Sequence, residues 1–560
     1  MPRDEVAKTV RSPHFGDDWW QRGVVYQVYP RSFADSNGDG IGDLPGIIEH
    51  LDHLGPEGLG IDALWLSPIY PSPGLDLGYD ISDHERVDPL FGSEADFDRL
   101  VSEAHRRGIR VILDLVMNHT SDQHRWFESS RSSRTGPYAD WYLWRDPSGR
   151  DATGQPLPPN NWVSFFGGPG WEWEPRREQF YFHTFLVQQP ELNWRAAGVQ
   201  DAQFEMVRRW LERGVDGFRL DVFNAFLKHP DLPSNPVRAG VTAWTRQIHL
   251  YDRDQPDFPA LIARFRAIVD AAPGRMSIGE LFDGTVEAAA GLTTDRHLVF
   301  EWALLEAPWT AEAIRAAIEA RERAFGPDRW PTVVLSNHDR SRHASRLAAS
   351  VGSDDIDAIA RAAAVLLLTV RGTPFLYYGE ELGLRDVDVP PEESVDPPAA
   401  WVSPDFEWWD RSRARTPMPW SSGPGAGFST GRPWLRLGDD ADTRNVAAEH
   451  ADPPSILSLY RRLIALRAET LALQLGNLGL LPDAGGDVLA YTRATDDQLV
   501  LVVLNLRQRP ATWRLPVMAA VTGWRPLLDA HSPGPPDPQV LAGPTIDLAP
   551  NGARIFLGVR

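Results

Sequence analysis

Short apolar runs alternate with amphipathic stretches along most of the chain, and this alternation limits the possible folds more than any other sequence feature. The apolar runs lie at residues 24–29, 63–67, 110–116, 217–222, 277–281, 297–302, 332–335 and 374–378. Helical periodicity appears between or after them, at residues 47–54, 97–107, 201–213, 258–269, 311–323, 357–370 and 457–468. Such alternation indicates βα units around a parallel sheet. Eight strands predict an α/β fold with a (β/α)8 TIM barrel rather than an open sheet.

Two long segments interrupt the alternation. Residues 120–190 are rich in Gly, Pro, Trp and polar residues, contain one strand-like run at 179–185, and are too long for an ordinary βα loop. We interpret them as a domain inserted after the third strand. Residues 382–434 are rich in Pro, Trp and Asp, and their aromatic residues favour an ordered active-site loop over disorder. The barrel is therefore predicted to comprise residues 1–119 and 191–477.

The last part of the chain has a different pattern. Residues 488–492, 499–504 and 511–515 read as short strands separated by turn-forming residues. Several short strands bounded in this way are typical of all-β structure. We therefore expect residues 478–560 to form an all-β C-terminal domain, a β-sandwich.

Composition excludes several classes of function. The formal net charge of −21 over 560 residues opposes binding to nucleic acid or to anionic membranes. The chain has no cysteine, which excludes disulfides, thiolate catalysis and Cys-ligated zinc. No apolar run is long enough for a signal peptide or a membrane span, so we expect a cytoplasmic protein. Nothing indicates an organic cofactor, and the sequence leaves the oligomeric state open.

Polar residues follow several of the predicted strands at their carboxyl ends. The active site of a TIM barrel lies at these ends, so the residues there are the first candidates for chemistry. They are Asp114, Asn118 and His119 after strand three, Arg219 and Asp221 on strand four, Glu280 after strand five, and Asn337, His338 and Asp339 after strand seven. We expect them to converge on the mouth of the barrel.

Two of these carboxylates suit glycoside hydrolysis, in which one group attacks the anomeric carbon and another protonates the leaving oxygen. Arg219 lies two residues before Asp221 on the same strand face, where it is expected to hold Asp221 ionised as the nucleophile. Glu280 follows the apolar residues Met276 and Ile278, so desolvation is expected to raise its pKa. Glu280 would then retain a proton that it can donate.

The segment after the first strand has the pattern of a cation-binding loop. Oxygen ligands alternate with glycines at Asp35, Asn37, Asp39, Ile41 and Asp43, where Ile41 would contribute its carbonyl oxygen. The helix and bidentate Glu of an EF-hand are missing, so a single loop binding a structural Ca²⁺ or Mg²⁺ is expected. The alternative is a Gly/Asp turn without a metal.

An ordered series of blocks carries a family resemblance over nearly the whole chain. The blocks are VVYQVYPRSF (24–33), DLVMNH (114–119), GFRLDVFNA (217–225), IGELF (278–282), LSNHD (335–339) and GTPFLYYGEELG (372–383). With them the chain resembles glycoside hydrolase family 13, the α-amylase family, and within it the α-glucosidase and oligo-1,6-glucosidase branch. The resemblance implies that Asp221 is the nucleophile, Glu280 the acid/base and Asp339 a carboxylate that holds the 2-OH and 3-OH of the sugar.

The same resemblance implies how glucose is held. His119, Arg219 and His338 would bind the same glucose unit as the three carboxylates. Asp80 and Arg415 match a family pair that closes the far side of the pocket, which implies exo attack. Phe166 and Phe185 match aromatic residues that line the pocket from the inserted domain. Val222, directly after the nucleophile, favours tolerance of α-1,6 bonds.

The function predicted from the sequence is a retaining, exo-acting α-glucosidase that releases glucose from short α-glucosides through a β-glucosyl ester on Asp221. Transglucosylation to an acceptor sugar, or conversion of sucrose or trehalose, uses the same chemistry and stays an alternative. A non-catalytic sugar-binding relative with a decayed site is a further alternative, which the presence of all three carboxylates disfavours.

Overall fold

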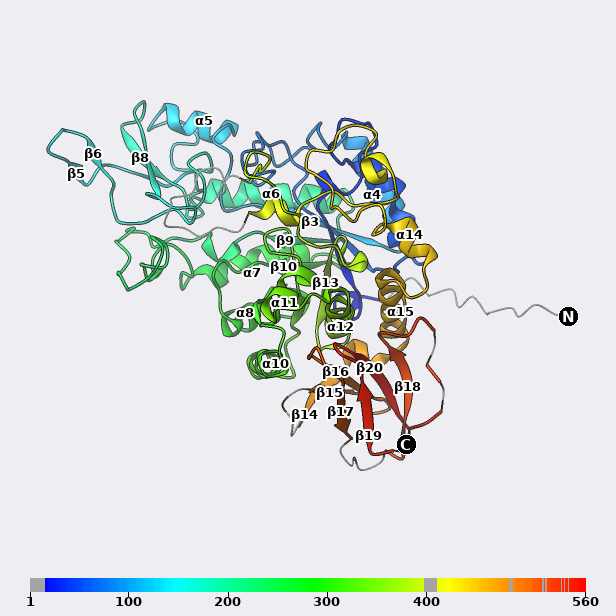
Figure 1. Cartoon of the computed structure of the whole chain (residues 1–560). Helices are drawn as coiled ribbons and strands as arrows, with labels where there is room; N and C mark the ends of the chain where they lie inside the picture. Colours follow the sequence, from blue (N-terminus) through cyan, green and yellow to red (C-terminus); the bar gives the residue numbers. More distant parts are fainter. Residues whose placement is uncertain are drawn as a thin grey trace.

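The computed structural model describes residues 16–396 and 410–559, apart from residues 483–485, 487, 516–517, 519–520, 535, 538 and 542. Its centre is a sheet of eight parallel strands in the order β11-β10-β9-β3-β2-β1-β13-β12 (Figure 1). The bounds are β1 Val25–Val28, β2 Ala63–Leu66, β3 Arg110–Leu115, β9 Gly217–Leu220, β10 Met276–Gly279, β11 His297–Val299, β12 Thr332–Val334 and β13 Thr373–Tyr377. All eight coincide with predicted strands, which confirms the TIM barrel.

The barrel is closed by side chains as well as by strand pairing. β11 and β12 stand at the two ends of the paired order, and Thr332 Oγ1 donates a hydrogen bond to the Val299 carbonyl across this gap (3.4 Å). Large apolar side chains fill the interior, among them Trp65, Ile278 and Phe375. Because strand side chains alternate between faces, the outward-facing residues pack instead against the surrounding helices.

Helices surround the barrel. The long ones are α4 Glu94–Arg106, α6 Ala197–Glu212, α7 Phe258–Val269, α10 Ala311–Phe325, α12 Ile356–Thr369 and α15 Ile456–Glu469. The shorter ones are α1 Trp19–Arg22, α2 Leu44–Glu49, α3 Leu51–Leu54, α8 Val286–Leu292, α9 Ala303–Glu306, α11 His343–Ser350, α14 Val446–Ala451 and α16 Leu471–Leu475. The sequence predicted a single helix at 47–54, whereas the structure divides this region into α2 and α3 at His50.

The insertion after β3 forms a small separate layer. It contains α5 Arg125–Ser132, a three-stranded antiparallel sheet of β4 Trp144–Arg145, β8 Gln179–Phe182 and β7 Trp171–Glu174, and a hairpin of β5 Gly149–Arg150 with β6 Pro156–Leu157. It has its own aromatic core, in which Trp162, Trp171 and Phe182 pack together. Figure 1 shows this insertion and the C-terminal sheets on opposite sides of the barrel in that view.

The C-terminal domain consists of two antiparallel sheets. The larger has the order β14-β15-β16-β20-β18, with bounds Asn477–Leu481, Val488–Ala494, Leu499–Asn505, Ala553–Val559 and Gly523–Asp529, respectively. The smaller pairs β17 Ala511–Arg514 with β19 Thr545–Leu548. Trp513 and Ile546 of the small sheet pack against one face of the large sheet. Tyr491 on the other face reaches the barrel, where its hydroxyl bonds to Thr369 Oγ1 (2.7 Å).

The segment after β13 returns across the barrel mouth. Its described parts include the 3-10 turns Glu380–Leu382, Arg411–Ala414 and Pro424–Gly427. Residues 397–409, within the loop predicted at 382–434, lie outside the described residues. Among the described helices none is both long and apolar enough to cross a membrane.

Candidate active site

Four barrel strands carry a carboxylate to the same end of the barrel. Asp114 lies near the end of β3, Asp221 follows β9, Glu280 follows β10, and Asp339 lies five residues beyond β12. The register pairs Asp114 with Arg219 and Gly279 with Leu220, so the ends of these neighbouring strands are level. The predicted convergence of these residues is therefore what the structure shows.

One buried guanidinium joins three of the four carboxylates. Arg219 Nη1 donates to Asp114 Oδ1 (2.7 Å) and to Asp221 Oδ1 (2.9 Å), and Arg219 Nη2 donates to Glu280 Oε2. Arg219 is only 1% exposed, so water hardly screens these contacts. Because Asp221 and Glu280 bind terminal nitrogens of one guanidinium, their carboxyl groups lie close together.

Val222, directly after Asp221, adopts a strained backbone conformation. Its φ of 35° and ψ of 41° place it in the left-handed region, which a β-branched residue rarely adopts. The chain there turns from β9 into the 3-10 turn Phe223–Ala225, and Phe223 N donates to the Glu280 carbonyl (3.2 Å). The strained turn therefore ties the backbone beside Asp221 to the backbone of Glu280.

Burial controls the protonation of the carboxylate pair. It raises the pKa of Glu280, as the sequence predicted. It also raises the pKa of Asp221 well above its usual range, and Arg219 offsets this only in part. Arg219 does favour the charged form of Asp221, as predicted, but burial outweighs it because one guanidinium is shared among Asp114, Asp221 and Glu280. Asp221 and Glu280 titrate as a coupled pair that retains a proton above the ordinary carboxyl range.

Asp339 lies in the opposite electrostatic environment. Burial raises its pKa, but the N–H of His338 and the guanidiniums of Arg411 and Arg415 lower it by more, so the net shift is downward. Arg411 Nη1 and Arg415 Nη2 both contact Asp339 Oδ1, at 3.0 and 2.7 Å. Asp339 is therefore the ionised carboxylate of the site.

His338 is held neutral between polar partners. Burial lowers its pKa to about 3. Gln27 Nε2 is 2.9 Å from His338 Nδ1, and because an amide nitrogen donates, Nδ1 is the acceptor. The proton is then on Nε2, which lies 2.6 Å from the Tyr79 hydroxyl and 3.1 Å from Asp339 Oδ2. His338 thus supplies a neutral N–H donor.

These shifts predict the pH dependence of catalysis. With Glu280 as the acid/base and Asp221 as the nucleophile, the roles predicted from the sequence, the rate should fall at high pH as Glu280 loses its proton and at low pH as Asp221 gains one. Since burial raises both pKa values, the whole bell-shaped profile of kcat/KM should lie above the ordinary carboxyl range of about 4. Glu280→Gln should remove the alkaline limb, measured with α-glucosyl fluoride, whose leaving group needs no proton. An unchanged alkaline limb in this variant would contradict the role of Glu280.

A cavity of about 460 Å³ opens at these carboxylates. Asp221, Glu280 and Asp339 line it, and so do three residues predicted to bind sugar, namely His119, Phe166 and Phe185. Burial lowers the pKa of His119 to about 4, so this imidazole is neutral too. Arg219 and His338, also predicted to bind glucose, lie behind the carboxylates rather than in the cavity wall and contact those carboxylates instead.

The predicted pair of Asp80 and Arg415 does not line the cavity, and this prediction is wrong. Asp80 is fully buried, and its carboxylate accepts hydrogen bonds from Ser72 Oγ (2.7 Å), Leu75 N (2.9 Å) and Asp76 N (3.1 Å). It therefore stabilises a turn. Arg415 is also fully buried and donates to the His338 carbonyl (2.7 Å) and to Asp339.

The ion pair at the cavity is instead Asp76 with Arg411. Arg411 Nη2 contacts Asp76 Oδ1 (2.9 Å), and both residues line the cavity. Gln189 Nε2 donates to the other oxygen of Asp76 (3.0 Å). Each member lies four residues before the one predicted. Asp76 lies in the same turn as Tyr79, whose hydroxyl contacts both Asp114 (3.1 Å) and His338, and these contacts appear only in the folded structure.

Sequence reasoning also missed a group of aromatic residues beside Glu280. Phe165, Trp244 and Phe282 line the cavity and contact one another. Trp244 comes from the long segment between the turn Phe223–Ala225 and α7, which has no helix or strand and thus no periodic signal.

The predicted metal loop folds as a series of side-chain turns. Asp35 accepts hydrogen bonds from the Gly38 and Gly40 backbone nitrogens (2.7 and 2.8 Å), and both glycines have positive φ. Asp39 Oδ1 accepts from Ile41 N (2.8 Å), and Asp43 Oδ1 accepts from Gly46 N (2.7 Å) at the start of α2. In the described part of the chain no three His, Cys, Asp or Glu side chains are placed to hold a metal together. A cation here would need the amide and carbonyl oxygens of the loop as well.

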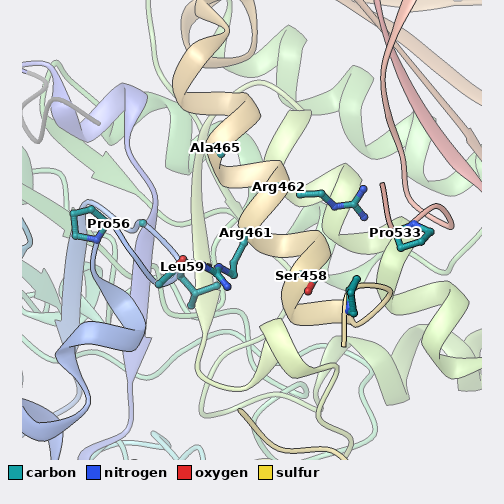
Figure 2. A pocket seen from close by; sticks show the side chains of 10 residues that line it. Pro56, Leu59, Ser458, Arg461, Arg462, Ala465 and Pro533 are labelled. Atoms are coloured by element: carbon teal, nitrogen blue, oxygen red, sulfur yellow. Dashed lines mark hydrogen bonds between the residues drawn. The ribbon is translucent and has the colours of Figure 1, made fainter. Parts of the chain in front are cut away.

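A second cavity, of about 450 Å³, lies on the outside of the barrel (Figure 2). It is formed by Arg461 and Arg462 of α15, the turn at Pro56 and Leu59, and Pro533 of the C-terminal domain. None of its lining residues is a carboxylate or an imidazole, so it lacks the groups for acid/base catalysis. The barrel mouth is thus the candidate active site.

Comparison with known families agrees with this geometry. Residues 27–476 match the family model described as "Alpha amylase, catalytic domain". The chain belongs to the α-amylase family, glycoside hydrolase family 13. It is therefore a glycoside hydrolase, and the matched residues include all four carboxylates that converge at the barrel mouth.

Curated relatives of this family member include several glucosidases. A probable alpha-glucosidase of Rhizobium meliloti (strain 1021) is 42% identical over 92% of this chain and 94% of the relative. An oligo-1,6-glucosidase of Heyndrickxia coagulans is 36% identical over 89% and 94%. A trehalose-6-phosphate hydrolase of Escherichia coli (strain K12) is 35% identical over 93% and 96%.

Similar solved structures include a glucosyl transfer enzyme and a trehalulose synthase. The alpha-glucosyl transfer enzyme XgtA has a TM-score of 0.87 and 40% identity, covering 97% of this chain and 100% of that one. The trehalulose synthase MutB from Pseudomonas mesoacidophila MX-45 has a TM-score of 0.85 and 35% identity, covering 96% and 99%. The family of this glycosidase thus includes proteins named for hydrolysis and for transfer.

Proposed function

We propose that the protein is a retaining, exo-acting α-glucosidase that releases single glucose units from the non-reducing end of short α-glucosides. The observation that carries this proposal is the binding of Asp221 and Glu280 to the two terminal nitrogens of Arg219. Retaining glycosidases hold their two carboxyl groups closer together than inverting enzymes, which need room for a water molecule between carboxylate and sugar. Two groups on one guanidinium fit the closer arrangement.

The cycle uses the coupled pair in two steps. Glu280 gives its proton to the glycosidic oxygen while Asp221 attacks the anomeric carbon, which forms a β-glucosyl ester and frees the aglycone. Glu280, now ionised, takes a proton from water, which attacks the ester and regenerates the Asp221 carboxylate. Asp339, ionised throughout, would hold sugar hydroxyls, His119 would contribute a neutral donor or acceptor, and His338 would orient Asp339 from behind.

Exo action is supported by the ion pair between Asp76 and Arg411. Both are nearly buried, and Gln189 and Asp339 hold them from either side. A fixed pair at one side of the cavity offers hydrogen-bond partners to the terminal hydroxyls of a single glucose. It also blocks the continuation of a longer chain, so only a chain end would fit.

The direct test is to follow the released anomer by NMR with α-1,2, α-1,3, α-1,4 and α-1,6 diglucosides. We expect α-glucose as the first product from the non-reducing unit, and we expect the linkages to be ranked by rate in the same experiment. β-Glucose as first product would contradict retention. Release of oligosaccharides rather than glucose from longer substrates would contradict exo action.

We also propose that the loop formed by Asp35, Asn37, Asp39, Ile41 and Asp43 binds a structural Ca²⁺ or Mg²⁺. Alternating oxygens around glycines of positive φ support it. The ion would stiffen the loop, and no catalytic step depends on it. Excess CaCl₂ or MgCl₂ should raise the unfolding temperature above that in EDTA. At a cation concentration of 100 times Kd, the free energy of unfolding should rise by up to about 3 kcal/mol. Asp39→Ala should abolish the shift, and equal unfolding temperatures in EDTA and Ca²⁺ would contradict the site.

A further inference from the structure

We infer that the leaving-group and acceptor side of the active site selects a planar aromatic aglycone over a sugar. This inference rests on the proposed retaining mechanism. Glu280 must face the glycosidic oxygen to protonate it, so the residues beside Glu280 contact the aglycone. Phe282 lies two residues after Glu280, whereas the pair of Asp76 and Arg411 serves the glucose unit. The aromatic group of Phe165, Trp244 and Phe282 is therefore placed on the aglycone side.

The three rings form a corner rather than a flat platform. Phe165 lies edge-on to Phe282, with centroids 4.9 Å apart and planes at 77°, and edge-on to Trp244, at 5.5 Å and 89°. Trp244 and Phe282 are 5.2 Å apart at 61°. A flat platform suits the apolar face of a sugar ring. A corner of steep angles suits an aromatic ring, which can present its face to one wall and its edge to another.

Trp244 is held in place before any ligand binds. His249 stacks on its indole at 3.7 Å with planes at 22°, and His249 Nε2 lies 3.0 Å from the Trp244 carbonyl. Asp252 fixes the other imidazole nitrogen at 2.6 Å. A wall that is already ordered costs little entropy on binding, so its contacts contribute more to affinity.

The corner offers few partners to sugar hydroxyls. Among its three side chains only the Trp244 indole can donate a hydrogen bond. Of the charged residues that line the cavity farther along, Arg238 already donates to the Thr245 carbonyl (2.9 Å) and Asp283 pairs with Arg253 (2.8 Å), while Glu306 and Arg340 line it as well. A sugar acceptor would bury hydroxyls with few partners here, which costs free energy that an aromatic alcohol does not pay.

Transfer to an acceptor reports on the aglycone side of the site alone, because every acceptor reacts with the same glucosyl ester of Asp221. The acceptor hydroxyl attacks the anomeric carbon, the bond to Asp221 breaks, and Glu280 takes the acceptor's proton. With α-glucosyl fluoride as donor, benzyl alcohol, cyclohexylmethanol and glucose are compared as acceptors at equal concentration. We expect the ratio of benzyl glucoside to disaccharide to exceed about 10, and the saturated alcohol to be a poorer acceptor than benzyl alcohol.

Variants assign the preference to the corner. Trp244→Leu and Phe282→Leu should each lower the ratio of benzyl glucoside to disaccharide about 5- to 10-fold. Phe282→Tyr, which keeps the ring, should restore it. Trp173→Leu, in the aromatic core of the insertion and away from the cavity, should leave it unchanged. Equal transfer to benzyl alcohol and glucose, equal transfer to the two alcohols, or unchanged ratios in both Leu variants would overturn the inference. A protein that releases no glucose from the donor would instead overturn the proposed function.

Discussion

Replacing Asp221 with Asn is expected to lower kcat for glucose release from p-nitrophenyl α-glucoside by about 10⁴-fold or more, with the fold intact. The substitution keeps the shape of the side chain but removes the nucleophilic carboxylate. It also leaves Arg219 its contacts with Asp114 and Glu280, so the guanidinium remains paired. Initial rates, together with the thermal unfolding temperature, check the prediction.

A matched variant and a chemical rescue sharpen this test. Asp283→Asn changes a carboxylate that lines the same cavity but pairs with Arg253, and it should keep most of the activity. Asp221→Gly leaves space at the nucleophile position, where added azide should attack the anomeric carbon and yield β-glucosyl azide. Full activity in Asp221→Asn, or α-glucosyl azide as the product, would show that another group is the nucleophile.

Replacing Asp76 with Asn should lower kcat/KM for α-glucosides about 10- to 150-fold, the range expected for losing a hydrogen bond to a charged group in a buried site. The loss of kcat/KM should come from weaker contacts with the glucose unit, since Asp76 and Arg411 lie at that side of the cavity. Stability should change little, because Arg411 keeps Asp396 and Asp339 as partners. The measurement is kcat/KM with one aryl glucoside and one disaccharide, alongside thermal unfolding.

Asp80→Asn is the matched control, in which stability rather than kcat/KM is expected to fall. The Asp80 carboxylate accepts two backbone N–H groups and the Ser72 hydroxyl, and an amide cannot accept at both of its atoms. This variant should therefore lose about 1–3 kcal/mol of stability. Its kcat/KM should change less than that of Asp76→Asn. A larger loss of kcat/KM in Asp80→Asn than in Asp76→Asn would return the pocket-closing role to Asp80.

The barrel could be predicted from the sequence because its strands are buried on both faces. Such strands read as continuous apolar runs, and each run between 24–29 and 374–378 coincides with a strand in the structure. The carboxylates at their ends follow from the same rule, since parallel strands end at one edge. The apolar pattern does not show where a helix is interrupted, as at His50, which divides one predicted helix into α2 and α3.

The loop residues of the site could not be predicted in the same way. Asp76 and Asp80 stand four residues apart in one turn, and only the hydrogen bonds of the folded turn show which of them is used by the backbone. Trp244 lies in a segment without regular structure, so its place beside Glu280 depends on contacts between distant loops. The ionisation of Asp221 depends on how many carboxylates contact Arg219. These carboxylates come from different strands, so their number is known only once the strands are packed in the barrel.

The left-handed backbone at Val222 has a consequence for engineering. A β-branched residue in this conformation costs about 1–2 kcal/mol, which glycine at the same position would relieve. Val222→Gly would also lose the burial of a side chain that is only 5% exposed, which stabilises the fold by about 1.5–3 kcal/mol, so no net gain in stability is expected. The same change would free the backbone between Asp221 and the Glu280 carbonyl and remove a side chain from the cavity wall. The strain at this residue is therefore offset by the burial of its own side chain, and a stabilised variant of this enzyme should be sought elsewhere in the barrel.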